Sequence, residues 1–428
     1  MIYEKRSCAP FLKIILKTKG RRMKYFAEEG KKTVKPSEVE NKTERRYDID
    51  WLRVFAMFSV FLIHNAIYFT YYSWYVKNPQ TSRGMTIFAT FLLQWTVPLF
   101  FFLAGENSRF SLSLRTGGQF IKERFMRLII PFLFGVLIVI APLQVYFQRV
   151  SRLHITDSFI EFYPQYFKGF YGFGGNFAWH GHHLWFLLAL FIFSLLLLPL
   201  FIYLKKESVQ RRISRMAIFF KKPGAIFLLG IPLVIIELLV NLQPSGIGMK
   251  EFGGWSPVIY PIFFLYGYIF ASDENFKETI EKHRIISLVM GTVLSAFVLF
   301  VGFAPNFKIQ LYKYIPNFPK EIFSLIDGII LPFSCWFLLI AILGFGSKYL
   351  NFNNRVLKYS NEAVLPFYIL HQTIIITIDF YLVSWNVAVI LKYLIIGILS
   401  FASIILIYHL IIKRINWLRF LFGMRPRK

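Results

Sequence analysis

The sequence predicts an all-α, polytopic membrane protein with about ten transmembrane helices and both termini in the cytoplasm. Three observations lead to this fold class. Hydrophobic residues make up 56% of the 428 residues, and the mean hydropathy is +0.51. The apolar residues gather in runs with few charges, each close to the ~20 residues that cross a hydrocarbon core. Lysine and arginine are concentrated in alternate connections between these runs.

The apolar runs give the predicted spans in order along the chain. Those between 224 and 271 are interrupted by glycine and proline, which weakens the helical pattern there. Many of the 50 phenylalanines lie near span ends with tryptophan and tyrosine, as is typical of interfacial belts. The predicted spans are 51–70, 85–104, 128–148, 184–204, 224–242, 255–271, 285–303, 323–344, 363–383 and 388–412.

The charge distribution sets the expected orientation. With the N-terminus inside, the cytoplasmic segments hold 38 lysines and arginines and the external loops hold nine. This asymmetry follows the positive-inside rule. The formal net charge of +26 would indicate nucleic acid as a partner of a soluble protein, but here the charge follows the membrane. We therefore expect a multi-pass protein of the cell (inner or plasma) membrane, with the lipid bilayer as a partner and no nucleic acid.

Three regions are expected along the chain. Residues 1–46 form a basic cytoplasmic tail, 47–417 one transmembrane domain, and 418–428 a basic cytoplasmic C-terminus. No internal repeat is found, which disfavours the common secondary-transporter architectures. The long external loop 149–183 is rich in aromatic residues and glycine, a composition that suits a carbohydrate ring.

The first span carries the most informative pair of residues. Arg53 and His64 are eleven residues apart, almost three helical turns, so both project from one face about 16 Å apart along the axis. Ionisable residues are costly in hydrocarbon and mark functional sites. His64 is the candidate general base, although a packing role through a hydrogen bond to a neighbouring helix is the plain alternative.

Arginines at the cytoplasmic side are candidates for binding phosphate. Arg53 can pair with Asp50 three residues earlier, and as a lone residue it would be read as an ordinary positive-inside charge. Arg124 and Arg127 are i,i+3 neighbours at the start of the third span. Arginine holds phosphate in a planar fork, so these three could clamp a phosphate-bearing ligand that enters from the cytoplasm.

Other intramembrane or interfacial residues are weaker candidates. His183 follows His180 and His182 at the external end of the fourth span, and His371 lies within the ninth. Asp327, in the eighth span, could orient His64 or an acceptor hydroxyl. No spacing of cysteine and histidine resembles a zinc site, so we expect no metal and no tightly bound cofactor.

Several segments together resemble the membrane acyltransferase-3 family of O-acyltransferases, which act on extracytoplasmic glycans. The glucan succinyltransferase-like branch is the nearest in appearance. The resemblance covers roughly 46–412. It rests on Asp50-Trp-Leu-Arg53 followed by His64, PLFFFLAGENSRF (98–110), Arg124-x-x-Arg127, HLWFLLAL (183–190) and LPFYILH (365–371).

The resemblance implies a fold of about ten helices and transfer of an acyl group, acetyl or succinyl, from cytoplasmic acyl-CoA. The implied acceptor is a hydroxyl of an extracytoplasmic glycan or glycolipid. In this reading His64 and Arg53 are catalytic, and Arg53, Arg124 and Arg127 hold the donor phosphates. The alternative from another class is a proton-coupled transporter or exporter of a glycan precursor, with the intramembrane histidines and carboxylates as a proton relay.

Overall fold

The computed structural model describes residues 45–243, 249–250, 253–304, 313–315 and 321–427. Within these ranges the chain forms helices and no strand beyond an isolated bridge between Phe170 and Phe177. The predicted all-α fold is therefore confirmed. The predicted tail 1–46 lies outside the described residues except for its last two, and everything below belongs to one compact unit, Arg46–Lys428.

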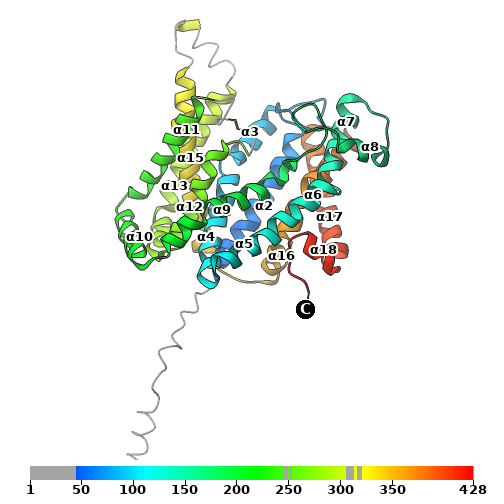
Figure 1. The fold of residues 1–428 in the computed structure, drawn as a ribbon. Helices are drawn as coiled ribbons and strands as arrows, with labels where there is room; N and C mark the ends of the chain where they lie inside the picture. Colours follow the sequence, from blue (N-terminus) through cyan, green and yellow to red (C-terminus); the bar gives the residue numbers. More distant parts are fainter. Residues whose placement is uncertain (1–44, 244–248, 251–252, 305–312, 316–320, 428) are drawn as a thin grey trace, which may run out of the picture. The chain divides into compact units, whose positions relative to one another are not determined.

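The first half of the chain builds four long apolar segments (Figure 1). The first is the single helix α2 (Tyr47–Ile67). The next two are each made of several helices, and a π-helix, η1, interrupts the third close to its start. The elements that follow α2 are α3 (Arg83–Leu93), α4 (Thr96–Leu114), α5 (Gly117–Arg124), η1 (Phe125–Ile129), α6 (Ile130–Leu137), α7 (Ile140–Leu153), α8 (Phe159–Tyr166), the 3-10 turn η2 (His182–Leu184) and α9 (Trp185–Leu204).

The second half begins with the amphipathic helix α10 (Glu207–Phe220), whose apolar face is buried and whose arginines point outward. Among the described residues, two short apolar segments, four long helices or helix pairs and a last short helix follow. They are η3 (Ala225–Leu229) with α11 (Gly230–Asn241), η4 (Pro257–Ile259) with α12 (Tyr260–Phe270), α13 (Glu274–Phe303), α15 (Glu321–Tyr349), α16 (Arg355–Leu382), α17 (Val389–Ile407) with η5 (Tyr408–Ile412), and α18 (Asn416–Leu421).

Eight of these segments are long and apolar enough to cross a membrane. They correspond to eight of the ten predicted spans. The other two predicted spans fall on the shorter apolar helices Ala225–Asn241 and Pro257–Phe270, the glycine- and proline-interrupted region. The count of ten and the cytoplasmic location of both termini remain predictions.

Polar caps explain why several helices begin where they do. The side chains of Ser82, Thr116, Ser158 and Asn354 each accept a hydrogen bond from a backbone N–H in the first turn of α3, α5, α8 and α16. Thr116 and Ser158 form complete capping boxes with a glutamine and a glutamate three residues later. Local sequence thus fixes the starts of the helices that follow exposed loops.

Helix α2 is the central element of the unit, in contact with α3, α4, α15, α16 and α17. On one side α13 and α15 pair along their length beside α11, and on the other α16 packs against α7 and α17 (Figure 1). Helices α4 and α12 approach at two glycines. A Cβ on Gly105 would lie 2.0 Å from the Phe264 carbonyl oxygen, and one on Gly267 would lie 1.8 Å from that of Phe102. Only glycine permits this backbone contact.

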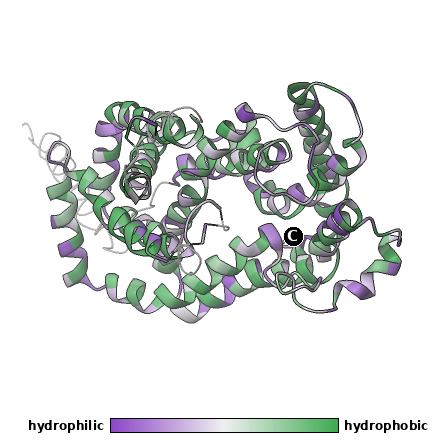
Figure 2. Cartoon of the chain, turned by 90° about the horizontal axis from the view of Figure 1, so that it is seen from above, coloured by the Kyte–Doolittle hydropathy of each residue, from purple (hydrophilic) through white to green (hydrophobic). Residues whose placement is uncertain are grey.

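Hydrophobic residues, coloured green, predominate along the helices in Figure 2. Ile285, Val289 and Val293 of α13 and Ile398 of α17 are all more than half exposed. Charged and amide side chains, by contrast, are buried within α16 and α17. A surface of this kind suits lipid, while interior polar groups need partners inside the protein.

Candidate active site

Three histidines from distant parts of the sequence meet in one cluster. Nδ1 of His64 on α2 lies 2.7 Å from Nε2 of His371 on α16. The ring of His183, at the start of the fourth apolar segment, is 5.0 Å from that of His371 and 6.4 Å from that of His64. His371 and His183 are buried, whereas His64 keeps part of its surface exposed. The structure thus brings together three residues that the sequence singled out separately.

The hydrogen bonds of His371 determine the tautomer of His64. Nδ1 of His371 lies 2.6 Å from the carbonyl oxygen of Tyr368, which can only accept, so this nitrogen carries the proton. In the neutral ring Nε2 of His371 is then the acceptor, and Nδ1–H of His64 donates to it. His64 is left with an unprotonated Nε2. This nitrogen is the free base of the cluster.

The hydrogen bonds of His183 fix the opposite tautomer, with the proton on Nε2. Its Nε2–H faces the carbonyl oxygens of Tyr368 and Ile369 at 3.1 and 3.2 Å. Its Nδ1 therefore accepts from the Gln144 amide, 3.2 Å away. Gln144 also donates to Thr373 at 2.7 Å. With both ring nitrogens engaged, His183 positions the backbone that holds His371 rather than offering a base.

Buried amides complete the interior network. Gln372 donates to the side-chain oxygen of Gln144 at 2.8 Å, and its side chain lies near the Tyr75 hydroxyl. That hydroxyl lies 2.6 Å from Nδ1 of His182. Sequence reasoning missed Gln144 and Gln372. The signal was present, because an uncharged amide in an apolar span also needs an interior partner.

A loop between α2 and α3, residues 68–82, covers the cluster from one side. The indole ring of Trp74 stacks on the ring of His64, with centroids 5.6 Å apart and planes at 21°. Arg152 donates to Ser73 at 3.1 Å and to the carbonyl oxygen of Trp74. Lys392, buried on α17, donates to Asn78 at 2.8 Å. The loop is tied to α7 and α17, and no pattern in the sequence indicated this.

Arg53 stands at the other end of the same helix face. Its guanidinium donates to Asp50 at 3.1 Å, the predicted i,i+3 pair, and to Asn361 of α16 at 2.9 Å. Arg53 and His64 therefore both contact α16, at Asn361 and His371. Eleven residues of continuous α-helix set them about 16 Å apart. The predicted common face is confirmed by the shared partner helix.

The other two arginines lie near Arg53. Arg124, the last residue of α5, donates to Ser108 at 2.8 Å, and Arg127 lies within η1 beside Glu123 at 3.8 Å. The positive charges of Arg53, Arg124 and Arg127 are close enough to repel one another. A π-helical turn between two of them changes their relative direction from that of an α-helix, and such turns are frequent at functional sites.

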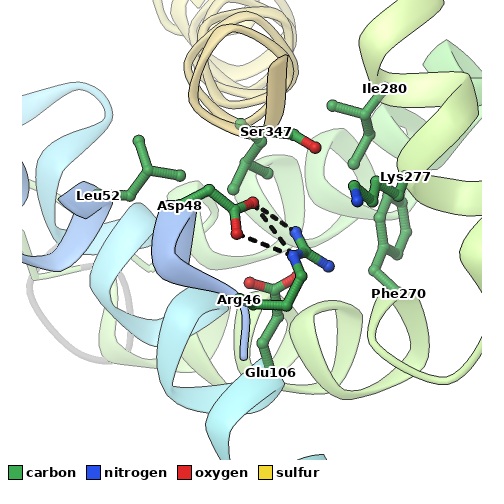
Figure 3. A pocket seen from close by; sticks show the side chains of 9 residues that line it. Arg46, Asp48, Leu52, Glu106, Phe270, Lys277, Ile280 and Ser347 are labelled. Atoms are coloured by element: carbon green, nitrogen blue, oxygen red, sulfur yellow. Dashed lines mark hydrogen bonds and ion pairs between the residues drawn. The ribbon is translucent and has the colours of Figure 1, made fainter. Parts of the chain in front are cut away.

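A small polar pocket lies beside this arginine end (Figure 3). Arg46 donates to both carboxylate oxygens of Asp48, and one oxygen of the buried Glu106 has no hydrogen-bond partner. The lining consists of Arg46, Asp48, Leu52, Glu106, Phe270, Lys277, Ile280, Leu343 and Ser347. It shares α2 with Arg53 but includes none of the three arginines above.

The intramembrane carboxylates lie elsewhere. Asp327 is on α15 next to Gly328, which packs against Leu238 and Asn241 of α11. The group bonded to His64 is His371, not a carboxylate. Among the described residues no group of three or more histidine, cysteine, aspartate or glutamate side chains is arranged to hold a metal ion.

Comparison with known proteins shows the family of this chain. The family described as an acyltransferase domain, acyltransferase-3, matches residues 46–409. The chain is 26% identical over 388 residues to the glucans biosynthesis protein C of Salmonella schwarzengrund (strain CVM19633), and 25% identical to that of Salmonella typhi. Each match covers 89% of this chain and 95% of the relative. No solved structure gives a significant match. The histidine cluster and the arginine end both lie in the matched region, and the chain belongs to the acyltransferase-3 family of membrane acyltransferases.

Proposed function

We propose that this protein transfers an acyl group, acetyl or succinyl, from cytoplasmic acyl-CoA to a hydroxyl of an extracytoplasmic glycan or glycolipid in the cell (inner or plasma) membrane. The observation that carries the proposal is the hydrogen-bond chain from the Tyr368 carbonyl through His371 to His64. It leaves the Nε2 lone pair of a partly exposed His64 as a base. A neutral imidazole in this tautomer can accept the proton of an alcohol.

The acceptor assignment draws on the relatives. They are named for glucan biosynthesis, and a glucan is a polymer of hydroxyl-bearing sugars. The aromatic external loop before His183 is consistent with an acceptor of this kind. In the predicted topology His64 lies in the outer half of the bilayer, toward the side on which such a glycan would be presented.

The donor assignment draws on the arginine end of α2. Arg53, Arg124 and Arg127 gather positive charge where the phosphates of CoA would enter from the cytoplasm. The phosphates and the thioester of an acyl-CoA are separated by its extended pantetheine arm. Two sites about 16 Å apart along α2 suit a long donor that is held at one end and reacts at the other.

The reaction is a direct acyl transfer. The acceptor oxygen attacks the thioester carbonyl carbon while its proton passes to Nε2 of His64. The tetrahedral intermediate collapses as the carbon–sulfur bond breaks, and the proton is returned to the thiolate, which leaves as the free thiol of CoA. His371 stabilises the transient imidazolium by accepting from Nδ1–H. The products are an O-acylated glycan and CoA.

The deciding experiment measures thiol release from acetyl-CoA and succinyl-CoA by the purified protein, with and without an oligosaccharide of glucose. We expect release that depends on the acceptor and is lost in His64→Ala at normal protein levels. A fully active His64→Ala variant would overturn the mechanism. Solute flux into proteoliposomes without thiol release would instead favour the transporter alternative.

A second experiment separates direct transfer from an acyl-histidine intermediate. The protein is incubated with radiolabelled acyl-CoA in the absence of acceptor and then denatured. Direct transfer predicts no protein-bound label, whereas an acylated His64 would retain it and give ping-pong kinetics.

A further inference from the structure

Trp74 carries a hydrogen-bond donor that the fold leaves unused. Its indole N–H is buried and has no hydrogen-bond partner, although the ring itself is only partly buried. A buried donor without an acceptor costs free energy, and a phenylalanine ring would fill much of this space without that cost. The N–H therefore calls for an explanation other than packing.

The location of Trp74 suggests a role for this N–H. Its ring stacks on His64, the residue with the free Nε2. In an acyl transfer the attacking hydroxyl is bonded to that nitrogen, and the acyl carbonyl lies within about 3 Å of the hydroxyl oxygen. Because the Trp74 ring stacks on His64, it lies next to the position that this carbonyl would take.

The loop holds Trp74 in a fixed orientation. Arg152 binds the Trp74 backbone and Ser73, Lys392 binds Asn78, and the neighbouring Tyr75 hydroxyl binds His182. These bonds come from three different elements outside the loop. A donor fixed before the reaction stabilises developing charge without reorganisation, which is the requirement for an oxyanion site.

We propose that the indole N–H of Trp74 donates a hydrogen bond to the acyl carbonyl oxygen as it becomes the oxyanion of the tetrahedral intermediate. Trp74 is then a catalytic residue of the acyl transfer, and this inference rests on the proposed function. No proton is transferred from the indole. The bond strengthens as the carbonyl carbon accepts the hydroxyl oxygen and weakens when the carbon–sulfur bond breaks.

Two substitutions separate the donor from the ring. Trp74→Phe keeps an aromatic ring on His64 but removes the N–H, whereas Trp74→Leu removes both. If the N–H acts on the oxyanion, we expect Trp74→Phe to lower kcat about 100-fold, with KM for donor and acceptor changed little. If the ring only packs on His64, Trp74→Phe keeps wild-type kcat and only Trp74→Leu loses it, which would overturn the inference.

The matched control is Trp417→Phe, because Trp417 lies on α18 and is 63% exposed. It should retain wild-type kcat.

A second measurement covers the case in which Trp74→Phe is poorly folded. It uses the dithioester analogue of the donor, in which sulfur, a weaker hydrogen-bond acceptor, replaces the carbonyl oxygen. Wild-type protein should slow markedly with this analogue, and an unchanged rate would also overturn the inference.

Failure of the two proposals gives different results. Wild-type protein that releases no thiol from acyl-CoA with any acceptor contradicts the proposed function. Wild-type protein that is active, with Trp74→Phe equally active, contradicts only the role of Trp74.

Discussion

Nε2 of His371 accepts a hydrogen bond of 2.7 Å from Nδ1–H of His64, and this single contact decides which nitrogen of His64 is a base. The arrangement resembles a catalytic triad, with His371 in the position of the acid and the Tyr368 backbone carbonyl holding His371 in turn. A neutral chain of this kind is suited to a membrane interior, where a buried carboxylate would be costly.

The first prediction concerns His371. His371→Ala should lower kcat about 100-fold or more, because His64 loses the acceptor that fixes its tautomer. Acyl-transfer rates are measured as a function of pH at saturating donor. The acid limb of the profile should move in the variant, which a purely structural residue would not cause.

The control for this substitution is His409→Ala, since His409 is exposed on η5. It should change neither kcat nor the pH profile. A His371→Ala variant with wild-type rate and profile would remove His371 from the mechanism.

The second prediction concerns pH in the wild-type protein. A protonated imidazole cannot accept a proton, so kcat should fall as the pH is lowered below the pKa of His64. Folding is followed in parallel by intrinsic fluorescence, so that loss of structure is not mistaken for titration. A kcat that rises as the pH falls, in protein that stays folded, would contradict a histidine base.

The third prediction concerns Arg53. Arg53→Ala should raise the donor KM about 10- to 100-fold through loss of charge-assisted hydrogen bonds to phosphate, and Arg53→Lys should recover part of it. Initial rates are measured over a range of acyl-CoA concentrations. The matched control is Arg211→Ala, because the Arg211 side chain on α10 is exposed. An unchanged donor KM in Arg53→Ala would contradict the phosphate role.

The fourth prediction tests the topology. Leu114 and Phe173 are 82% and 85% exposed, and the predicted orientation puts them on opposite sides of the membrane. In a Cys8→Ser background, a membrane-impermeant maleimide should label Phe173→Cys in intact cells and Leu114→Cys only after permeabilisation. Cys335 is buried and should remain unlabelled. The reverse pattern would invert the orientation.

The fifth prediction concerns stability. Gly267→Ala places a methyl group against the Phe102 carbonyl and should force α4 and α12 apart, at a cost of about 1–3 kcal/mol. The melting temperature in detergent should fall accordingly. Gly118→Ala is the control, because nothing lies within 4 Å of its added Cβ. Equal melting temperatures for the two variants would contradict the close packing.

The features that depend on local sequence pattern could be predicted from the sequence. Hydropathy located eight long segments, and the eleven-residue spacing placed Arg53 and His64 on one helix face, because both depend on neighbours within a single helix. The pairing of His64 with His371 could not be predicted, since it joins residues 307 positions apart through helix packing. Depth in the membrane alone would instead favour Asp327 as the partner of His64.

Other parts of the site lacked a readable signal for a different reason. Trp74 lies in a loop without periodicity, and its stacking on His64 depends on bonds from Arg152 and Lys392 that only the folded chain forms. The sequence around Asn361 is polar and has no distinctive motif. Only its hydrogen bond from Arg53 shows that Asn361 belongs to the site. Tertiary contacts of this kind produce no recognisable spacing of residues in the sequence.

The two contacts between α2 and α16 have a consequence for selectivity. Arg53 is hydrogen-bonded to Asn361 and His64 to His371, so the two helices run parallel and are joined by hydrogen bonds at two points along their length. An α-helix does not stretch, and the distance between anchor and base is therefore built into the backbone. If Arg53 binds the donor phosphates and His64 is the base, as proposed above, a thioester on a shorter carrier could not reach His64 while its phosphate is bound at Arg53.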